Sequence, residues 1–217
     1  MLETIYFTRH GHRSDWIVPV LNNCYPTGLF YDPQLSPHGC NQAKELAQYF
    51  VSNTIQFDKI YSSPLFRTVQ TANYVAEKLD LEILVENGLG EWEIPEPAST
   101  SKLREFFPRI NTLYTSVSNH PKADETIQDV HDRLNKTMQE IISRCDAENQ
   151  IKSILLVGHA ASVTAGVRAV LEDRLAVINC GTCSLSKFVR EGGEWKLRLN
   201  GDCSFLSGGE ENNWAFD

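Results

Sequence analysis

Short apolar runs of strand length alternate along this chain with longer segments of helical periodicity. The runs at 4–8 and 154–157 are rich in β-branched, aromatic or aliphatic residues, which is typical of buried strands. Helical spacing follows Ser36-Pro37, where a serine N-cap precedes a proline in the first turn. Such alternation is typical of an α/β fold with a largely parallel sheet. We expect strands at 4–8, 59–62, 82–85 and 154–157, a C-terminal hairpin from 184–189 and 195–199, and helices that begin at the Ser36 and Ser63 caps and cover 127–145 and 160–171.

The length and composition favour a single domain. With 217 residues and 41% hydrophobic content, the chain is large enough to bury one sizeable core, so we expect one domain over residues 1–217. Residues 93–123 contain four prolines and little regular pattern, which predicts a lid inserted into that domain.

The charge balance excludes some classes of partner. A formal net charge of -8 argues against non-specific binding to nucleic acid or anionic membranes, which requires a basic face. No apolar run approaches the roughly 18 residues of a membrane span, and no signal peptide pattern opens the chain. We therefore expect a soluble protein of the cytoplasm, the nucleus or both, with no direct contact to nucleic acid or membrane. The sequence leaves the oligomeric state open, with a homodimer among the alternatives.

The six cysteines are expected to be free thiols, because a chain of ordinary size without a secretory signal gives no reason for disulfides. Cys180 and Cys183 have the two-residue spacing used in redox and zinc sites. Zinc would need two more suitably spaced ligands, and a redox pair normally opens a helix, whereas a strand is expected after Cys183. We interpret this pair as structural.

Two histidines lie where a strand is expected to lead into a helix or loop. His10 follows the strand at 4–8, and His159 follows the strand at 154–157. In an open α/β sheet, such strand ends are where ligands bind. Arg9 and Arg13 flank His10, and neighbouring positive charge lowers the pKa of an imidazole. A neutral histidine among arginines suits nucleophilic attack on a phosphoryl group, whose oxygens arginine binds in pairs.

Five groups of residues follow one another along the chain, namely Arg9-His10-Gly11, Leu35-Ser36 with Gly39 and Gln42-Ala43, Ser62-Ser63-Pro64 with Arg67, Gly90-Glu91-Trp92 and Gly158-His159-Ala160. These motifs resemble those of the histidine phosphatase superfamily, the phosphoglycerate-mutase-like group, and occur in its order over most of the chain. That resemblance implies a three-layer α/β sandwich with helices on both faces of a mostly parallel central sheet. Arg13 and the Glu91-Trp92 pair resemble the TULA or STS branch. The terminal stretches 200–211 and 213–217, with the segment 158–162, resemble the phosphatase domain of the yeast tau subunit of transcription factor IIIC.

The resemblance also implies roles for individual residues. His10 would be the nucleophile that becomes phosphorylated, and Glu91 would protonate the leaving oxygen. The phosphoryl group would be held without a metal or a cofactor, since arginines supply the positive charge. The residues expected to hold it are Arg9, Arg13, Arg67, His159 and Ala160.

The substrate is less constrained than the chemistry. An aromatic leaving group could be enclosed by Trp16, Phe30, Tyr31, Trp92 and Phe106, although these side chains are equally consistent with ordinary core. Extra phosphates of a nucleotide or an inositol polyphosphate could instead bind Lys102, Arg104, Arg109 and Lys122. Three functions stay open: a phosphatase acting on phosphate monoesters, a non-catalytic interaction module related to the transcription factor IIIC subunit, and a phosphoglycerate-type mutase.

Overall fold

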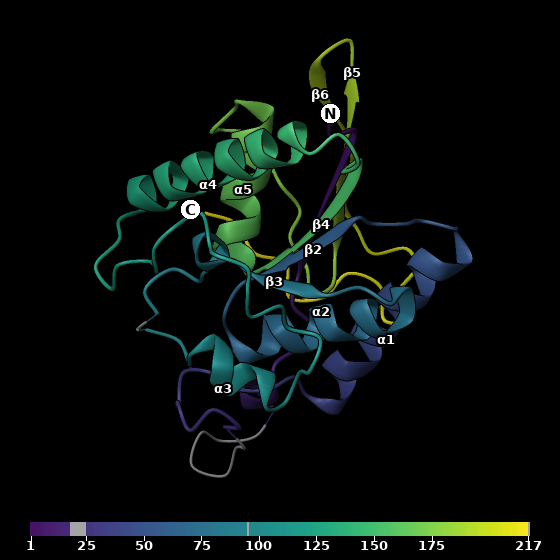
Figure 1. Ribbon diagram of the computed structural model, residues 1–217. Helices are drawn as coiled ribbons and strands as arrows, with labels where there is room; N and C mark the ends of the chain where they lie inside the picture. Colours follow the sequence, from purple (N-terminus) through teal and green to yellow (C-terminus); the bar gives the residue numbers. More distant parts are fainter. Residues whose placement is uncertain (18–24, 95, 217) are drawn as a thin grey trace.

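A six-stranded sheet forms the centre of the molecule in the computed structural model, which describes residues 1–17, 25–94 and 96–216 (Figure 1). The strand order is β3-β2-β4-β1-β5-β6, and β1, β2, β3 and β4 pair in parallel, whereas β5 and β6 are antiparallel. The mostly parallel sheet and the C-terminal hairpin are therefore confirmed. The strands are β1 Thr4–Arg9, β2 Lys59–Ser62, β3 Ile83–Val85, β4 Ser153–Gly158, β5 Leu185–Glu191 and β6 Glu194–Asp202.

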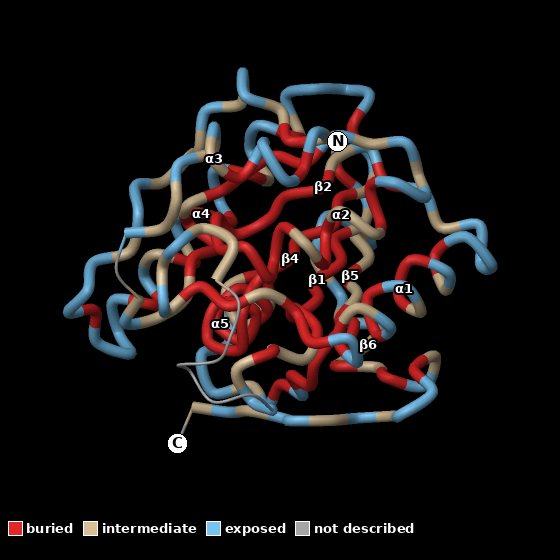
Figure 2. Tube along the Cα trace, turned by 90° about the horizontal axis from the view of Figure 1, so that it is seen from below, coloured by how far each residue is buried: buried red, intermediate tan, exposed pale blue. Residues whose placement is uncertain are grey.

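Helices cover both faces of this sheet, which confirms the three-layer arrangement. On one side α1 (Pro37–Ser52) packs on α2 (Phe66–Leu79), and on the other α4 (Ile127–Ala147) packs on α5 (Ala160–Leu171) (Figure 1). Each pair buries its own apolar cluster against the strands, and in Figure 2 the buried strands β1, β4 and β5 run through the middle of the molecule. The ends of two parallel strands, β1 and β4, meet where Arg9 pairs with Gly158.

One helix start differs from the sequence prediction. The Ser36 side chain accepts a hydrogen bond from the Gly39 amide and caps α1 as expected. The Ser63-Pro64 pair does not cap α2, which begins at Phe66 after an N-cap at Leu65. The Ser63 amide continues the sheet by donating to Val157, and Asp32 accepts the hydrogen bond of the Phe66 amide at 2.7 Å. A carboxylate from a distant loop thus satisfies an amide that a local serine was expected to serve.

The segment 93–123 is partly integrated into the core. It contains the short helix α3 (Thr100–Arg104), and Leu103, Phe107 and Ile110 are buried. Ile110 also forms a parallel bridge to Ile83 of β3, so the segment lies along the edge of the sheet. The middle of the segment therefore belongs to the packed body, and a covering role for the parts around it stays a prediction.

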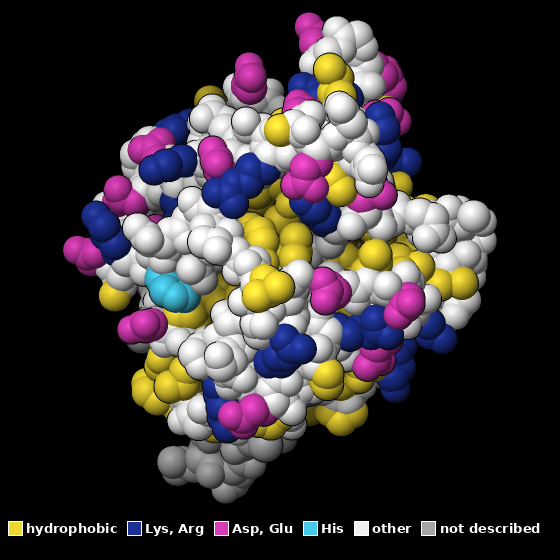
Figure 3. All heavy atoms as spheres, in the orientation of Figure 1, with side chains coloured by type: hydrophobic (Ala, Val, Ile, Leu, Met, Phe, Trp, Pro, Cys, Tyr) yellow, Lys and Arg dark blue, Asp and Glu magenta, His cyan; other side chains and the backbone are white. Residues whose placement is uncertain are grey.

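The surface and the helices give two further findings. On the described part of the face in Figure 3, basic and acidic side chains are interspersed, and no continuous basic surface is seen there. In the described ranges of the chain, no helix is both long enough and apolar enough to cross a membrane.

Candidate active site

His10 lies directly after β1, where its amide donates to the Gly158 carbonyl at 3.0 Å and continues the pairing with β4. Its side chain is buried, and Nδ1 donates to the Gly11 carbonyl at 2.8 Å, since a carbonyl can only accept. That hydrogen bond places the ring proton on Nδ1. Nε2 of the neutral ring therefore carries the lone pair that a nucleophile needs.

The pKa of His10 is lowered well below its ordinary value. Burial is the largest cause, followed by the positive charges of Arg67 and Arg9, which oppose a further proton. The sequence predicted the direction from the arginines alone. Burial could not be deduced from the local sequence, because it results from the loops that close over the strand end.

His159 lies after β4 and is the N-cap residue of α5. Its ring centroid is 5.2 Å from that of His10, so the two histidines predicted from separate strands share one site. His159 Nε2 and the Ser63 hydroxyl form a hydrogen bond of 2.7 Å, and Nδ1 lies 3.6 Å from a Glu91 carboxylate oxygen. Burial and the charge of Arg67 lower the pKa of His159 well below its ordinary value, so this ring is also neutral.

Two arginines hold buried donors that have no protein partner among the described residues. Arg67, in the first turn of α2, is fully buried, and its Nη1 donates to the Tyr31 carbonyl at 3.4 Å and lies 3.7 Å from Asp32. Its Nε and Nη2 are unpaired, as is Nε of Arg9. Burial lowers the pKa of Arg67 to about 10, which leaves it charged at neutral pH. Buried guanidinium donors without partners are costly, and a bound anion would satisfy them.

Arg9 is oriented by backbone carbonyls. Its Nη1 donates to Cys180 at 2.8 Å and to Asn212 at 2.6 Å, while the Arg9 carbonyl accepts from the Cys183 amide at 3.1 Å. Cys180 and Cys183 are free and buried, in agreement with a structural interpretation of this pair. The Cys180 and Asn212 carbonyls fix one edge of the Arg9 guanidinium and leave Nε for a ligand.

Arg13 and Trp16 complete the site on its open side. The guanidinium of Arg13 is bound by Asp15 through hydrogen bonds of 2.9 and 2.5 Å and lies 5.5 Å from the centroid of the Trp16 ring. The Trp16 ring is also 5.8 Å from Arg9 and 6.3 Å from the ring of His10. Trp16 is the member of the predicted substrate pocket that the structure brings closest to the histidines by a described contact.

The other predicted pocket residues are more dispersed. Phe30 is 71% exposed with its ring against Tyr31, whose hydroxyl donates to the Glu96 carbonyl. Phe106 packs on Phe66 and has no contact with either histidine among the described residues. The indole of Trp92 turns toward Phe216, with a centroid distance of 6.0 Å. Of these residues, Tyr31 contacts the site through its backbone carbonyl, which accepts a hydrogen bond from Arg67.

Glu91 and Ala160 lie beside His159. One Glu91 carboxylate oxygen accepts the Trp92 amide hydrogen bond at 2.9 Å, and the other faces His159. Ala160 is the buried first residue of α5. The N-terminus of α5 therefore lies in the same region, and its positive dipole end favours an anion there.

Sequence reasoning missed two residues that contact the predicted site residues. Ser63 was assigned to helix capping, yet it binds His159. Asp32 was not singled out, yet it is fully buried and lies beneath Arg67. A lone carboxylate in an irregular, proline-containing segment gives no periodic signal, so only its partner across the fold could identify it.

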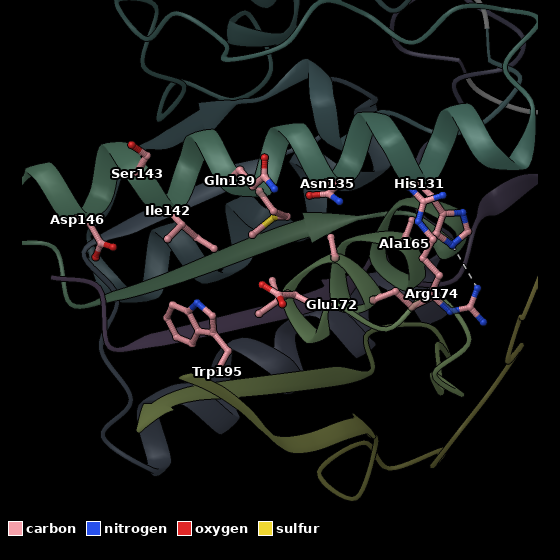
Figure 4. Close-up of a pocket in the computed structure, with 14 residues that line it drawn as sticks. His131, Asn135, Gln139, Ile142, Ser143, Asp146, Ala165, Glu172, Arg174 and Trp195 are labelled. Carbon is pink, nitrogen blue, oxygen red and sulfur yellow. Dashed lines mark hydrogen bonds between the residues drawn. The ribbon is translucent and has the colours of Figure 1, made fainter. Parts of the chain in front are cut away.

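A separate groove of about 620 Å³ lies between α4, α5 and the hairpin. Ile142 points toward Trp195 across it (Figure 4). Its lining includes His131 but none of the residues predicted for the site. In residues 1–17, 25–94 and 96–216, no group of three or more His, Cys, Asp or Glu side chains is arranged to hold a metal ion.

Residues 5–202 match the family model described as Histidine phosphatase superfamily (branch 1). The transcription factor tau 55 kDa subunit of Saccharomyces cerevisiae is 34% identical, over 100% of this chain and 59% of its own length. The human ubiquitin-associated and SH3 domain-containing protein A is 26% identical, over 98% of this chain and 36% of its own length. This chain thus spans less than two thirds of either curated relative.

Among solved structures, the ecdysone phosphate phosphatase from Bombix mori in complex with tungstate superposes with a TM-score of 0.76. The alignment covers 92% of this chain and 93% of that one at 19% identity, which shows a shared fold. The expected resemblances to the superfamily and to the transcription factor subunit are both confirmed.

Proposed function

Because this chain belongs to the histidine phosphatase superfamily, branch 1, we propose that it hydrolyses phosphate monoesters through a phosphohistidine at His10. One observation carries the proposal: Nε2 of His10 is available in a site where buried guanidinium donors of Arg9 and Arg67 have no protein partner among the described residues. A phosphoryl group would supply the missing acceptors and place phosphorus next to the nucleophile.

In the first step, Nε2 of His10 attacks phosphorus and forms a P–N bond as the bond to the leaving oxygen breaks. The electron pair of that bond goes to the leaving oxygen, and the Glu91 carboxyl supplies its proton, so an alcohol departs. The arginines neutralise the non-bridging oxygens, whose charge otherwise repels the nucleophile. Glu91 is suited to this role because one carboxylate oxygen lies 3.6 Å from Nδ1 of His159, whose ring centroid is 5.2 Å from that of His10.

In the second step, water attacks the phosphohistidine and Glu91, now a carboxylate, accepts its proton. The P–N bond breaks, its electron pair returns to Nε2, and inorganic phosphate leaves. A water nucleophile distinguishes this reaction from a mutase, in which a second substrate oxygen takes the phosphoryl group. Release of inorganic phosphate at the rate of alcohol formation would exclude the mutase alternative.

We favour aryl phosphates as the substrate class. Trp16 supports this choice, because its ring lies at the open side of the site against Arg13 and within 6.3 Å of His10. Two of the four basic residues considered for extra phosphates are engaged in ion pairs: Lys102 pairs with Glu105, and Arg109 pairs with Asp80. These ion pairs argue against a dedicated polyphosphate site in residues 102–109.

The decisive experiment compares the wild-type protein with His10→Ala. We expect the wild type to hydrolyse p-nitrophenyl phosphate and to form an acid-labile phosphohistidine, and we expect the variant to lose on the order of 10³ or more in turnover. Circular dichroism checks that the variant is folded. A folded variant that keeps over half of the wild-type rate would exclude His10 as the nucleophile.

A second candidate is an interaction module of a nuclear transcription complex, which the 34% identity to the yeast tau 55 kDa subunit favours. A scaffold does not require convergent buried positive charge, whereas a phosphatase does. If purified wild-type protein shows no turnover with any phosphate ester but binds transcription factor subunits, the interaction module is the better description. Localisation to the nucleus would agree with that reading, and localisation to the cytoplasm would not.

A further inference from the structure

The short segment that contains Glu91 is hydrogen-bonded by a side chain of α4. We refer to residues 88–92 as the acid loop. Arg133, on α4, donates from Nη1 to the Gly88 carbonyl at 2.7 Å and to the Gly90 carbonyl at 3.1 Å. Both hydrogen bonds fall on the backbone just before Glu91. Arg133 therefore fixes where this backbone enters the site.

Arg133 is itself held rigidly. Its Nε and Nη2 donate to the two carboxylate oxygens of Glu125, each at 2.7 Å, and both side chains are nearly buried. This paired geometry leaves only Nη1 for the acid loop. The Glu125 carbonyl also accepts from the indole nitrogen of Trp92 at 2.6 Å. One unit, Arg133 with Glu125, thus holds both ends of the acid loop.

The Glu91 carboxylate has few contacts of its own. One oxygen accepts from the adjacent Trp92 amide, and the other lies 3.6 Å from His159. The position of the carboxylate therefore follows the position of its backbone. Gly90 allows the loop to lie close to Pro121, since a Cβ there would come within 2.6 Å of the Pro121 ring. Because the backbone of the acid loop is fixed this closely, the position of the Glu91 carboxyl group is fixed as well.

We propose that Arg133, locked by Glu125, is a positioning residue for Glu91 as the proton donor to the leaving oxygen. The proposal rests on the proposed function, because it concerns the same site. Arg133 touches no substrate, and it acts by fixing the backbone on which the acid is carried. Its loss should therefore impair proton transfer selectively, and leave nucleophilic attack by His10 largely intact.

The dependence on the leaving group tests this selectivity. p-Nitrophenolate leaves readily without a proton, whereas phenolate and alkoxides need one, so in the first step a misplaced acid slows only the esters of poor leaving groups. Because Glu91 also accepts the proton of water in the second step, the test uses kcat/KM, which reports only the steps up to departure of the leaving group. For Arg133→Met, we expect kcat/KM with phenyl phosphate to fall on the order of 10²-fold, and kcat/KM with p-nitrophenyl phosphate to fall by less than about fivefold.

Arg190→Met is the matched control. Arg190 also binds a carboxylate through paired contacts, with Asp146 at 2.8 and 2.9 Å, but it donates to the Leu2 carbonyl, next to the start of β1 and away from the strand ends that hold the histidines. We expect Arg190→Met to slow both substrates equally or not at all. An equal loss of kcat/KM with both substrates in Arg133→Met would overturn the proposal. Absence of any turnover by the wild type would instead overturn the proposed function.

If Arg133→Met does not fold, Trp92→Phe provides the test, because it removes only the indole donor to the Glu125 carbonyl. We expect a several-fold loss confined to phenyl phosphate. An unchanged ratio of the two rates in folded Trp92→Phe would count against the unit formed by Arg133 and Glu125.

Discussion

Arg67 contacts one anion within the protein, the carboxylate of Asp32, and keeps further guanidinium donors that have no partner among the described residues. Asp32 lies 3.7 Å from Nη1, and both side chains are completely buried. Burial raises the pKa of Asp32, and the charge of Arg67 opposes that rise. The free donors Nε and Nη2 are on the same guanidinium. Asp32 thus partly compensates the buried charge and leaves two donors for a phosphoryl group.

This arrangement predicts different results for the two partners. Arg67→Ala should lower kcat/KM by about 10² to 10³, by analogy with the loss of one oxyanion donor. It should also destabilise the fold by roughly 3 kcal/mol, because it leaves Asp32 buried without its cation. Asp32→Asn keeps an oxygen for the Phe66 amide and should cost less than about tenfold in rate. Steady-state kinetics and urea unfolding of both variants measure these effects. A larger rate loss for Asp32→Asn than for Arg67→Ala would contradict the assignment.

At the scale of elements, α1 is pressed against the loop that follows β1. A Cβ on Gly39 would lie 2.1 Å from the His12 carbonyl oxygen, and one on Gly11 would lie 2.6 Å from the Gly39 carbonyl oxygen. At both positions the added methyl group would clash with backbone atoms, so no side-chain rotation could relieve the clash. The Ser36 amide also donates to the His12 carbonyl at 2.9 Å, so the start of α1 and the loop form one unit.

Gly39→Ala should therefore separate α1 from the loop that carries His10. We expect a loss of stability of about 1 to 3 kcal/mol or more from overpacking, together with a reduced kcat. Asn41→Ala, at an exposed position of the same helix, is the control and should change neither by much. Thermal unfolding and p-nitrophenyl phosphate kinetics check both. Wild-type stability in Gly39→Ala would show that the loop can move away without cost.

A C-terminal strap, residues 211–216, secures Arg9 from the opposite side. The Glu211 carbonyl accepts from the Thr182 amide at 3.0 Å, and the Asn212 carbonyl accepts from Arg9. Farther along, the Phe216 ring lies 4.9 Å from the His131 ring. The strap thus runs from the site toward α4.

Removing residues 211–217 should weaken binding of a phosphate analogue. A hydrogen bond to a charged group contributes about 1.5 to 3 kcal/mol, so we expect the affinity for orthovanadate to fall roughly 10- to 100-fold. A shorter truncation that removes only residues 214–217 keeps the Asn212 carbonyl and should lose much less. Inhibition constants of the two truncated forms provide the measurement. Equal constants would show that Asn212 does not orient Arg9 for binding.

The elements were predictable to the extent that their signals are local. Apolar runs and helical spacing identified the strands and the major helices, because burial of one face repeats along the sequence. The start of α2 was wrong, since its first amide binds Asp32 from a separate loop. The same difference between local signals and long-range contacts applies to the site. His10 and His159 could be found at strand ends, whereas the roles of Ser63 and Arg133 depend on contacts between distant segments.

At the scale of the whole molecule, the site is formed at the expense of stability in acid. His10 and His159 are buried together with Arg67, and their pKa values are lowered well below the ordinary value of 6.5. The unfolded chain exposes both rings, which then titrate near 6.5. Above that pH both states are neutral and the histidines do not alter stability. As the pH falls below 6.5, the two histidines bind protons in the unfolded state but stay neutral in the folded state. The free energy of unfolding therefore declines until the pH reaches the pKa values of the folded state.

The free energy of unfolding should therefore decrease by about 1.4 kcal/mol per pH unit for each histidine between about pH 6 and pH 5. Urea unfolding of wild-type protein and of His10→Ala over this range isolates one ring, because other titrating groups, including Asp32 with its opposite shift, are common to both. The variant should show a slope smaller by about 1.4 kcal/mol per pH unit. Equal slopes would mean that His10 takes up its proton in the folded state as readily as in the unfolded chain. The neutral imidazole required for attack on phosphorus would then be absent in mild acid, and the rate would fall with the first protonation.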